Sequence, residues 1–181
     1  MLFRSVDAID KLRDTMQSHE RCSVVEVMGH RAGHLAVYVG IAVGANAIIV
    51  PEHPLDFERD IVEKIRHARI HGHSHFIIIV AEGAGSAVEL SQKIKDAAGM
   101  DPRITVLGHT QRGGSPSARD RVTASRMGKY ALDVLLEGKT NRVIGIIDGN
   151  MQDFDIYEAL EMKRELQASM YETASILSMG K

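Results

Sequence analysis

The stretch "HFIIIVAEG", residues 75–83, decides the fold class because its apolar run is unbroken. A strand with one solvated face alternates apolar and polar residues, whereas a strand covered on both faces is apolar throughout. Amphipathic helical patterns lie on either side of this run, at 57–72 and 85–99. Ser86 and Glu89 predict a capping box at the start of the second helix. A buried strand between two helices indicates parallel strand pairing.

The same alternation of strand and helix patterns extends over the whole chain. Further strands are predicted at 22–28, 46–51, 103–109 and 142–148. Further helices are predicted at 5–17, at 32–45, from Ser115 as N-cap and Pro116 as first helical residue to Gly138, and at 155–178, where the helix can be broken. We therefore predict an α/β fold, a layered and mainly parallel sheet with helices on both faces.

Composition limits the functional classes. The 181 residues suffice for one domain or one domain and a part, and the net charge of −2 provides no basic field for nucleic acid. Cys22 is the only cysteine, so an internal disulfide is excluded and a reducing compartment is expected. Acidic residues come too early for a signal peptide, and the apolar runs are too short to span a membrane. We therefore predict a cytoplasmic protein that binds neither nucleic acid nor membrane.

Polar residues directly follow several predicted strands, at the edge where ligands bind in α/β sheets. The turn "VMGHRAG", residues 27–33, places a glycine, His30 and Arg31 at the start of a helix, which suits an anion. Taken alone, an ordinary turn with two solvated side chains is the favoured interpretation. Glu82 ends the central strand, where a carboxylate needs a partner. The sequence does not choose between sugar hydroxyls and a neighbouring arginine as that partner.

The strongest candidate for a ligand site is "RITVLGHTQRGGSPSARD", residues 103–120. His109, Gln111 and Arg112 close the strand that Arg103 opens, and two glycines lead into a helix whose N-terminus attracts negative charge. Arg112 can hold a phosphate group through two parallel hydrogen bonds. A charged loop with a glycine hinge is the less favoured interpretation. The pattern therefore predicts an anion site, with a sugar phosphate as its ligand.

The histidine-rich stretch "HARIHGHSH", residues 67–75, is a candidate of another kind. Histidines alone can bind Zn²⁺, but no carboxylate or cysteine lies within the stretch to complete a ligand set. A solvated helix end, or a weak anion site that strengthens on protonation, is the favoured interpretation. We therefore assign no metal ligand from the sequence.

Three segments together resemble one known family. They are "SHERCSVVEVMGHRAGHLA" (18–36), "IIIVAEG" (77–83) and "RITVLGHTQRGGSPSARDRVTASRMG" (103–128), and with their spacing they resemble the carboxyl-terminal half of bacterial ATP-dependent 6-phosphofructokinase. The resemblance implies an allosteric, homo-oligomeric glycolytic kinase that transfers the γ-phosphoryl group of ATP to the 1-hydroxyl of fructose 6-phosphate, using Mg²⁺. Alternatives are a pyrophosphate-dependent relative, a non-catalytic regulatory subunit that binds a sugar phosphate, and a remnant without function.

The resemblance also implies roles for individual residues. The positions that bind fructose 6-phosphate in the family match Arg21, Met28, Gly29, His30, Glu82, Arg103, His109, Thr110, Gln111 and Arg112. Among these, Arg21 and Arg103 would reach the 6-phosphate across a subunit interface, and Glu82 would bind sugar hydroxyls. The nucleotide-effector site of bacterial members matches Arg13, Asn46, His71 and His73.

Three positions depart from the family pattern. His30 stands where bacterial members have an arginine that stabilises the transferring phosphoryl group, so His30 or Arg31 would take that role imperfectly. Asn46 stands at an acidic effector position, and "HGHSH" (71–75) replaces the basic effector loop. Activation by ADP of the usual kind is therefore not expected.

The family's amino-terminal half has no match in these residues. That half carries the nucleotide loops, the Mg²⁺ ligand and the aspartate base, so we expect this chain alone to be inactive and to bind neither ATP nor Mg²⁺. The expected parts are a fructose 6-phosphate-binding domain (1–112), a segment that would pack into the nucleotide domain (113–150) and a helical return (151–181). Exposed apolar surface should cause pairing, as a homo-oligomer or with a separate nucleotide-binding half. The start "MLFRS" matches the family poorly and suggests a truncated or split gene, or a fragment.

Overall fold

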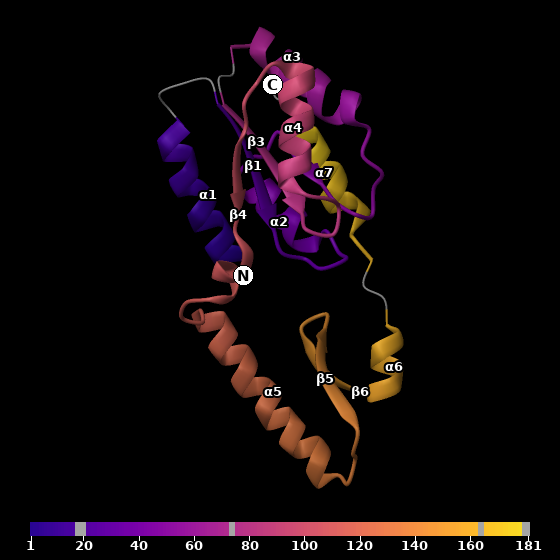
Figure 1. Ribbon diagram of the computed structural model, residues 1–181. Coiled ribbons are helices and arrows are strands. Elements are labelled where there is room, and N and C mark those ends of the chain that lie inside the picture. Colours follow the sequence, from indigo (N-terminus) through magenta and orange to yellow (C-terminus); the bar gives the residue numbers. More distant parts are fainter. Residues whose placement is uncertain (17–20, 73–74, 163–164, 179–181) are drawn as a thin grey trace. The chain divides into compact units, whose positions relative to one another are not determined.

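The computed structural model describes residues 1–16, 21–72, 75–162 and 165–178. The chain divides into two compact units. Unit 1 consists of residues 1–113 and 166–181, and unit 2 consists of residues 114–165. Each unit has its own sheet (Figure 1).

A four-stranded parallel sheet forms the centre of unit 1. Its strands are β1 (Arg21–Val27), β2 (Ala47–Ile49), β3 (His75–Ala81) and β4 (Arg103–Val106). The strands lie in the order β2-β3-β1-β4, and each neighbouring pair is parallel. β3, the apolar run of the sequence, therefore has a strand on both sides, and its six residues from Phe76 to Ala81 are buried.

Helices cover both faces of this sheet (Figure 1). One face carries α1 (Leu2–Met16), α2 (His34–Ala42) and α7 (Ala168–Ser178), and the other carries the π-helix η1 (Glu58–Val62), α3 (Glu63–Ile70) and α4 (Ala87–Ala98). Successive side chains of a strand point to opposite faces, so Ile77 and Ile79 enter the first core and Ile78 and Val80 the second. The predicted α/β fold with helices on both faces is confirmed.

Unit 2 is a long helix followed by a hairpin and a short helix. Its elements are α5 (Ala118–Leu136), β5 (Arg142–Ile147), β6 (Asn150–Asp155) and α6 (Ile156–Glu161). β5 and β6 pair antiparallel around Asp148 and Gly149, whose φ angles are 50° and 81°. The sequence prediction missed β6 because its residues are mostly polar, although Asp-Gly between strands is a hairpin signal. The last predicted strand is therefore the first half of a hairpin.

The start of α5 differs from the prediction. Ser115 was expected as N-cap with Pro116 as the first helical residue, but Ser117 caps the helix and Ala118 begins it. The reason is a capping box, in which Ser117 Oγ accepts from Asp120 N–H at 3.2 Å and Asp120 Oδ2 accepts from Ser117 N–H at 2.8 Å. Ser115 has an alanine three residues later, so it cannot form this reciprocal pair.

The end of β4 differs from the prediction, and the carboxyl-terminal helical region is broken. The strand expected at 103–109 ends at Val106, and Gly108, with a φ of +50°, begins the short 3₁₀ helix η2 (Gly108–Arg112). The helix expected at 155–178, for which the sequence allowed a break, is two helices, α6 and α7, separated between Glu161 and Ala168. Within the described ranges, no helix has the length and apolar character needed to cross a membrane.

Candidate functional site

Three loops of unit 1 meet at the carboxyl edge of the parallel sheet. Val27 pairs with Ala81 and Glu26 pairs with Val106, so β1, β3 and β4 end side by side. The loops that follow them therefore start from one edge, where ligands bind in this class of sheet. We call these loops, residues 28–33, 82–86 and 107–112, the carboxyl-edge loops.

The first two carboxyl-edge loops are joined through Glu82. Its Oε1 accepts hydrogen bonds from the backbone N–H of Gly29 at 3.1 Å and of His30 at 2.6 Å. His30 has a φ of +54°, an uncommon backbone conformation for a residue with a side chain. A Cβ atom on Gly83 would lie 2.1 Å from the carbonyl oxygen of His30, so only glycine allows this close approach.

The two backbone hydrogen bonds also set the charge of Glu82. They lower its pKa, with the bond from Gly29 as the largest cause, and the positive charge of Arg112 is a smaller contribution in the same direction. The sequence left sugar hydroxyls and an arginine as alternative partners of this carboxylate. The structure shows backbone amides as its direct partners, so Glu82 is an anion that shapes the turn.

A second carboxylate holds the other end of the same turn. Glu52 accepts from the backbone N–H of Gly33 through Oε1 at 2.8 Å and Oε2 at 3.1 Å. Glu52 follows β2, whose neighbour in the sheet is β3, so topology brings it to this edge. Glu52 was not predicted as a site residue, although its position directly after a predicted strand was the available signal. The turn from Gly29 to Gly33 is thus fixed by carboxylates at both ends.

The third loop is the short helix η2, and Gln111 anchors it. Gln111 is only 1% exposed. Its Oε1 accepts from Ser5 Oγ at 2.9 Å and from Met28 N–H at 3.4 Å, and its Nε2 donates to the Gly108 carbonyl at 3.2 Å. These bonds join η2 to α1 and to the end of β1. Gln111 therefore positions the loop from inside.

The neighbours of Gln111 on η2 face solvent. His109, Thr110 and Arg112 are exposed, and the Thr110 hydroxyl donates to the Leu107 carbonyl at 2.6 Å. The carboxyl edge thus combines a rigid turn, the Glu82 carboxylate and the exposed side chains of His109 and Arg112. An exposed guanidinium on a fixed backbone can bind a phosphate group through paired hydrogen bonds.

The candidate residues separate into two groups at opposite edges of the sheet. Met28, Gly29, His30, Glu82, His109, Thr110, Gln111 and Arg112 all lie in or beside the carboxyl-edge loops, and Arg31 is exposed next to His30. Arg103 begins β4, opposite Ser23 near the start of β1, so it lies at the amino edge of the sheet. Arg21 begins β1 at the same edge. Within one chain, Arg21 and Arg103 are therefore not brought to the carboxyl-edge loops.

The candidate effector residues lie at or near the amino edge, where several make structural contacts. Arg13 Nη2 donates to the Val43 carbonyl. Asn46 Oδ1 accepts from Ile77 N–H at 2.9 Å, and Asn46 N–H donates to the Ile77 carbonyl at 2.8 Å. His71 Nδ1 lies 2.8 Å from the His67 carbonyl oxygen. His73 lies outside the described residues, so a common effector site remains a prediction.

Metal-binding side chains do not gather in the described part of the chain. Among residues 1–16, 21–72, 75–162 and 165–178, no group of three or more His, Cys, Asp or Glu side chains could hold a metal ion. Cys22 is buried, and burial raises the pKa of its thiol to about 12. A thiol with so high a pKa is a poor metal ligand and nucleophile.

Comparison with known proteins gives consistent results. A family model described as phosphofructokinase matches residues 2–135. The chain is 54% identical over 173 residues to ATP-dependent 6-phosphofructokinase 1 of Clostridium perfringens, covering 96% of this chain and 54% of that protein. It is 48% identical over 174 residues to ATP-dependent 6-phosphofructokinase of Bacillus cytotoxicus, with the same coverage of 96% and 54%. The chain spans about half the length of the curated relatives it matches.

Solved structures show the same relationship. Phosphofructokinase from Saccharomyces cerevisiae matches with a TM-score of 0.83 and 31% identity, over 98% of this chain and 24% of that chain. Phosphofructokinase of Pichia pastoris in the T-state matches with a TM-score of 0.76 and 32% identity, over 98% of this chain and 21% of that chain. The α/β fold is therefore shared with these larger proteins.

Proposed function

Because this chain belongs to the phosphofructokinase family, as its sequence resemblance predicts, we propose that it is the fructose 6-phosphate-binding portion of an ATP-dependent 6-phosphofructokinase. The complete enzyme would transfer the γ-phosphoryl group of ATP to the 1-hydroxyl of fructose 6-phosphate in the cytoplasm. Relatives at 54% and 50% identity carry the name ATP-dependent 6-phosphofructokinase, which favours ATP over pyrophosphate as the donor. The carboxyl-edge loops would supply the sugar-phosphate site.

The observation that carries this proposal is the exposed pair His109 and Arg112 on the anchored helix η2. Arg112 would hold the 6-phosphate through two parallel hydrogen bonds, and His109 would donate a further one. Arg21 and Arg103 lie at the other edge of the sheet, so their contribution would come from a second copy of the chain. A homo-oligomer would therefore complete the phosphate site.

The turn beside η2 would bind the sugar. Glu82 already uses Oε1 for the N–H groups of Gly29 and His30, so its Oε2 would accept from a sugar hydroxyl. Met28 and Gly29 would contact the sugar through the backbone of the turn. His30 or Arg31 would face the phosphoryl group in transfer, because both follow the same turn. Thr110 and Gln111 would act by holding the η2 backbone in place.

The described residues of this chain do not form a site for Mg²⁺ and ATP. The described part of the chain has no acidic or histidine cluster for a metal, and the sequence contains no GxxxxGK[ST] phosphate loop. We propose that residues outside this chain bind the nucleotide and Mg²⁺ and supply the base. These 181 residues would then bind and orient the acceptor sugar without catalysing transfer.

Unit 2 would serve as the contact with the nucleotide-binding half. Its described residues expose many large apolar side chains, including Leu135, Leu136 and Leu160, as expected for a surface that packs against another domain. The boundary that the sequence predicts between residues 112 and 113 would then separate the part that binds the substrate from the part that contacts that half. Copies of the same chain are the alternative cover for this surface.

Calorimetric titration with fructose 6-phosphate tests the proposal. The chain should bind the sugar phosphate, and Arg112→Ala should weaken binding by about 10- to 100-fold, since a hydrogen bond to a charged group contributes about 1.5–3 kcal/mol. Arg66→Ala is the matched control, because Arg66 is exposed and pairs with Glu58 on the π-helix, away from the carboxyl edge. Unchanged affinity of Arg112→Ala would contradict the site assignment.

Assays with ATP and with pyrophosphate test the proposal that this chain binds the sugar while residues outside it bind the nucleotide and supply the base. The chain alone should show no phosphoryl transfer with either donor. Activity of this chain alone with either donor would refute the claim that nucleotide binding and the base lie elsewhere. Failure to bind any sugar phosphate would instead favour a remnant without function.

A further inference from the structure

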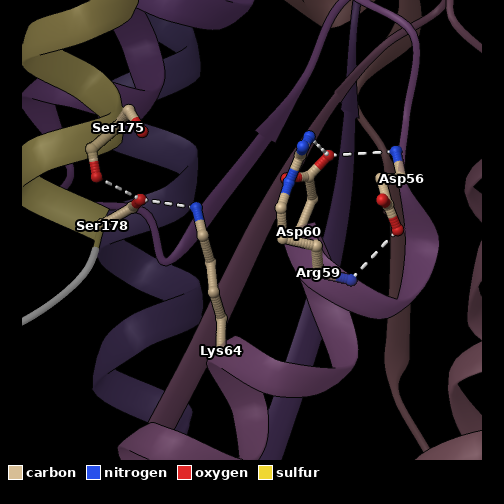
Figure 2. Close-up of polar contacts among 6 residues, drawn as sticks. All are labelled: Asp56, Arg59, Asp60, Lys64, Ser175 and Ser178. Atoms are coloured by element: carbon tan, nitrogen blue, oxygen red, sulfur yellow. Dashed lines mark hydrogen bonds and ion pairs between the residues drawn. The ribbon is translucent and has the colours of Figure 1, made fainter.

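Unit 1 contains a cavity that lies outside the carboxyl-edge loops. Its volume is about 180 Å³, and its wall is formed by β2, by the segment from His53 to Lys64 and by α7. Arg59, Asp60 and Lys64 line it from one side, and Ser175 and Ser178 line it from α7 (Figure 2). All of these residues belong to unit 1, so the cavity does not depend on the placement of unit 2.

Asp60 is the one carboxylate among the residues that line the cavity, and it is paired with Arg59. Asp60 Oδ1 accepts from Arg59 Nε at 2.8 Å, and Asp60 Oδ2 accepts from Arg59 Nη2 at 3.1 Å. Asp60 Oδ2 also accepts from the backbone N–H of Asp56 at 3.0 Å (Figure 2). This paired geometry is the strong form of an arginine–carboxylate contact. Arg59 and Asp60 therefore pair with each other, and Asp60 acts on Lys64 only from a distance, without an ion pair.

Among the described residues, the hydrogen-bond partner of Lys64 is neutral. Its Nζ donates to Ser178 Oγ at 2.7 Å, and Ser178 Oγ in turn donates to the Ser175 carbonyl at 2.7 Å (Figure 2). No carboxylate lies within 4 Å of Lys64 Nζ among the described residues. The side chain is partly buried, and this burial lowers its pKa despite the nearby charge of Asp60. A partly buried ammonium group without a counter-ion is costly, and an anion beside it would be stabilised.

From these contacts we propose that the cavity binds a small organic monocarboxylate. The charged lining residues are Arg59, Asp60 and Lys64, so the wall has one net positive charge and matches a single negative charge. The carboxylate would accept from Lys64 Nζ and from the hydroxyl of Ser175. Its short apolar tail would contact Leu55 and Ala174, which also line the cavity.

The size and shape of the cavity restrict the ligand further. Its volume of about 180 Å³ lies below the range of about 300–1,000 Å³ that drug-sized ligands occupy. His53 and Tyr171 stack with ring centroids 4.0 Å apart and form one wall. A nucleotide or a sugar bisphosphate would not fit this space, whereas an acid of a few carbon atoms would. The site is therefore separate from the proposed fructose 6-phosphate site in both position and ligand.

Titration of the whole chain with propionate, followed by ¹H–¹⁵N NMR spectra at constant ionic strength, tests this proposal. Saturable shifts should centre on Tyr171, Ser175 and Ser178. Propionamide, which has the same shape without the charge, should bind at least tenfold more weakly. Absence of saturable shifts, equal binding of propionamide, or tighter binding of inorganic phosphate than of propionate would overturn the monocarboxylate assignment.

Variants separate the role of Lys64 from non-specific attraction. Lys64→Met should weaken propionate binding at least tenfold, because it keeps the length of the side chain and removes the charge. Lys93→Met is the matched control, since Lys93 is an exposed lysine on α4, and it should bind propionate like the unchanged chain. Ser175→Ala is a milder variant for the case that Lys64→Met does not fold, and it should weaken binding two- to fivefold. Unchanged binding in a folded Lys64→Met or in Ser175→Ala would contradict the proposal.

Discussion

Units 1 and 2 differ in how much of their apolar surface they bury. In unit 1, two continuous cores lie on the two faces of the sheet and include most of β1 and β3. Among the described residues of unit 2, Val134 is the only apolar side chain that is buried. The large exposed apolar side chains of unit 2 are Val122, Leu132, Leu135, Leu136, Val143, Ile146, Ile147, Ile156, Tyr157, Leu160 and Met162. Unit 1 therefore has a buried core on each face of its sheet, whereas unit 2 leaves most of its large apolar side chains exposed within this chain.

The two units also hold their polar groups by different means. In unit 1, Glu82 and Glu52 accept from backbone N–H groups on another loop, so tertiary contacts fix the turn between β1 and α2. In unit 2, several polar contacts join residues close in sequence, as between Ser117 and Asp120 at the start of α5 and between Arg142 and Asp153 across the hairpin. The turn of unit 1 therefore depends on contacts between separate loops, whereas these contacts of unit 2 lie within one helix turn and one hairpin. Three pairs of variants and one titration test this difference between the units.

Leucine-to-alanine substitutions should give the largest difference. Leu90 on α4 is 7% exposed and lies in a core of unit 1, so Leu90→Ala should lower the free energy of unfolding by about 2–5 kcal/mol. Leu136 on α5 is 77% exposed, so Leu136→Ala should change it by about 0.5 kcal/mol or less. Urea denaturation followed by circular dichroism measures both. Similar losses for the two variants would show that unit 2 buries Leu136 in an assembly and would break the contrast.

Glycine-to-alanine substitutions should act in opposite directions. Gly83→Ala places a Cβ 2.1 Å from the His30 carbonyl oxygen, so we expect a loss of about 1–3 kcal/mol and weaker sugar-phosphate binding. Gly128 lies inside α5 with no atom within 4 Å of an added Cβ, so Gly128→Ala should stabilise that helix by about 0.4–1 kcal/mol. Thermal denaturation and calorimetry report both effects. Stabilisation by Gly83→Ala would show that the two loops do not pack as closely as described.

Helix caps should show a smaller difference. Ser117→Ala removes the bonds that Ser117 Oγ makes with Asp120 but keeps the bond from the Ser117 backbone N–H to Asp120 Oδ2, and it should destabilise the first turn of α5 by about 1 kcal/mol. Ser86→Ala removes the cap of α4, but the N–H of Ala87 also donates to Glu26 Oε2 at 3.1 Å, so we expect a smaller effect. Amide hydrogen exchange in the first turn of each helix measures the fraying. Equal fraying in both variants would remove the distinction between local and tertiary stabilisation.

Acidification should have the smallest effect on stability, and this effect should be confined to the turn at Gly29 and His30. The pKa of Glu82 is lowered in the folded chain by the N–H groups of Gly29 and His30. Ionised Glu82 therefore stabilises the folded chain fully above the unfolded pKa of about 4.3. This stabilisation is lost as the pH falls through the lower pKa of the folded chain. NMR shifts of the Gly29 and His30 amide protons should follow this titration. In Glu82→Gln the same shifts should not change with pH in this range, and persistence of the titration would assign it to another group.

Much of the fold could be predicted because buried parallel strands leave a strong pattern. The apolar run 75–83 correctly predicted β3, since burial on both faces excludes polar residues from most of its length. β6 was missed because its hairpin exposes polar side chains and depends on the turn at Asp148 and Gly149. The start of α5 was misplaced because two serines compete for the cap, and only Ser117 has a carboxylate three residues later. The sequence pattern therefore failed to choose between Ser115 and Ser117 as the cap, because the choice depends on one contact with Asp120.

The candidate site was predictable in position but not in its contacts. Glu82 follows a buried strand, and parallel topology brought it to the same edge as Arg112. Its partners could not be predicted, because the N–H groups of Gly29 and His30 look the same in sequence as any other backbone amides. Glu52 was missed for a similar reason, since its role depends on the folded position of Gly33. The roles of these residues in binding a substrate stay predictions.

The buried thiol of Cys22 has a practical consequence for the contrast between the units. With a pKa of about 12, its thiolate fraction at pH 7 is on the order of 10⁻⁵, and it is the only cysteine of the chain. The thiol of Cys22 should therefore react very slowly with maleimide reagents in the native protein. Single cysteines placed at exposed Val88 of unit 1 and Leu136 of unit 2 could be labelled with spectroscopic probes without removing Cys22. Distances between such probes would give the arrangement of the two units in solution.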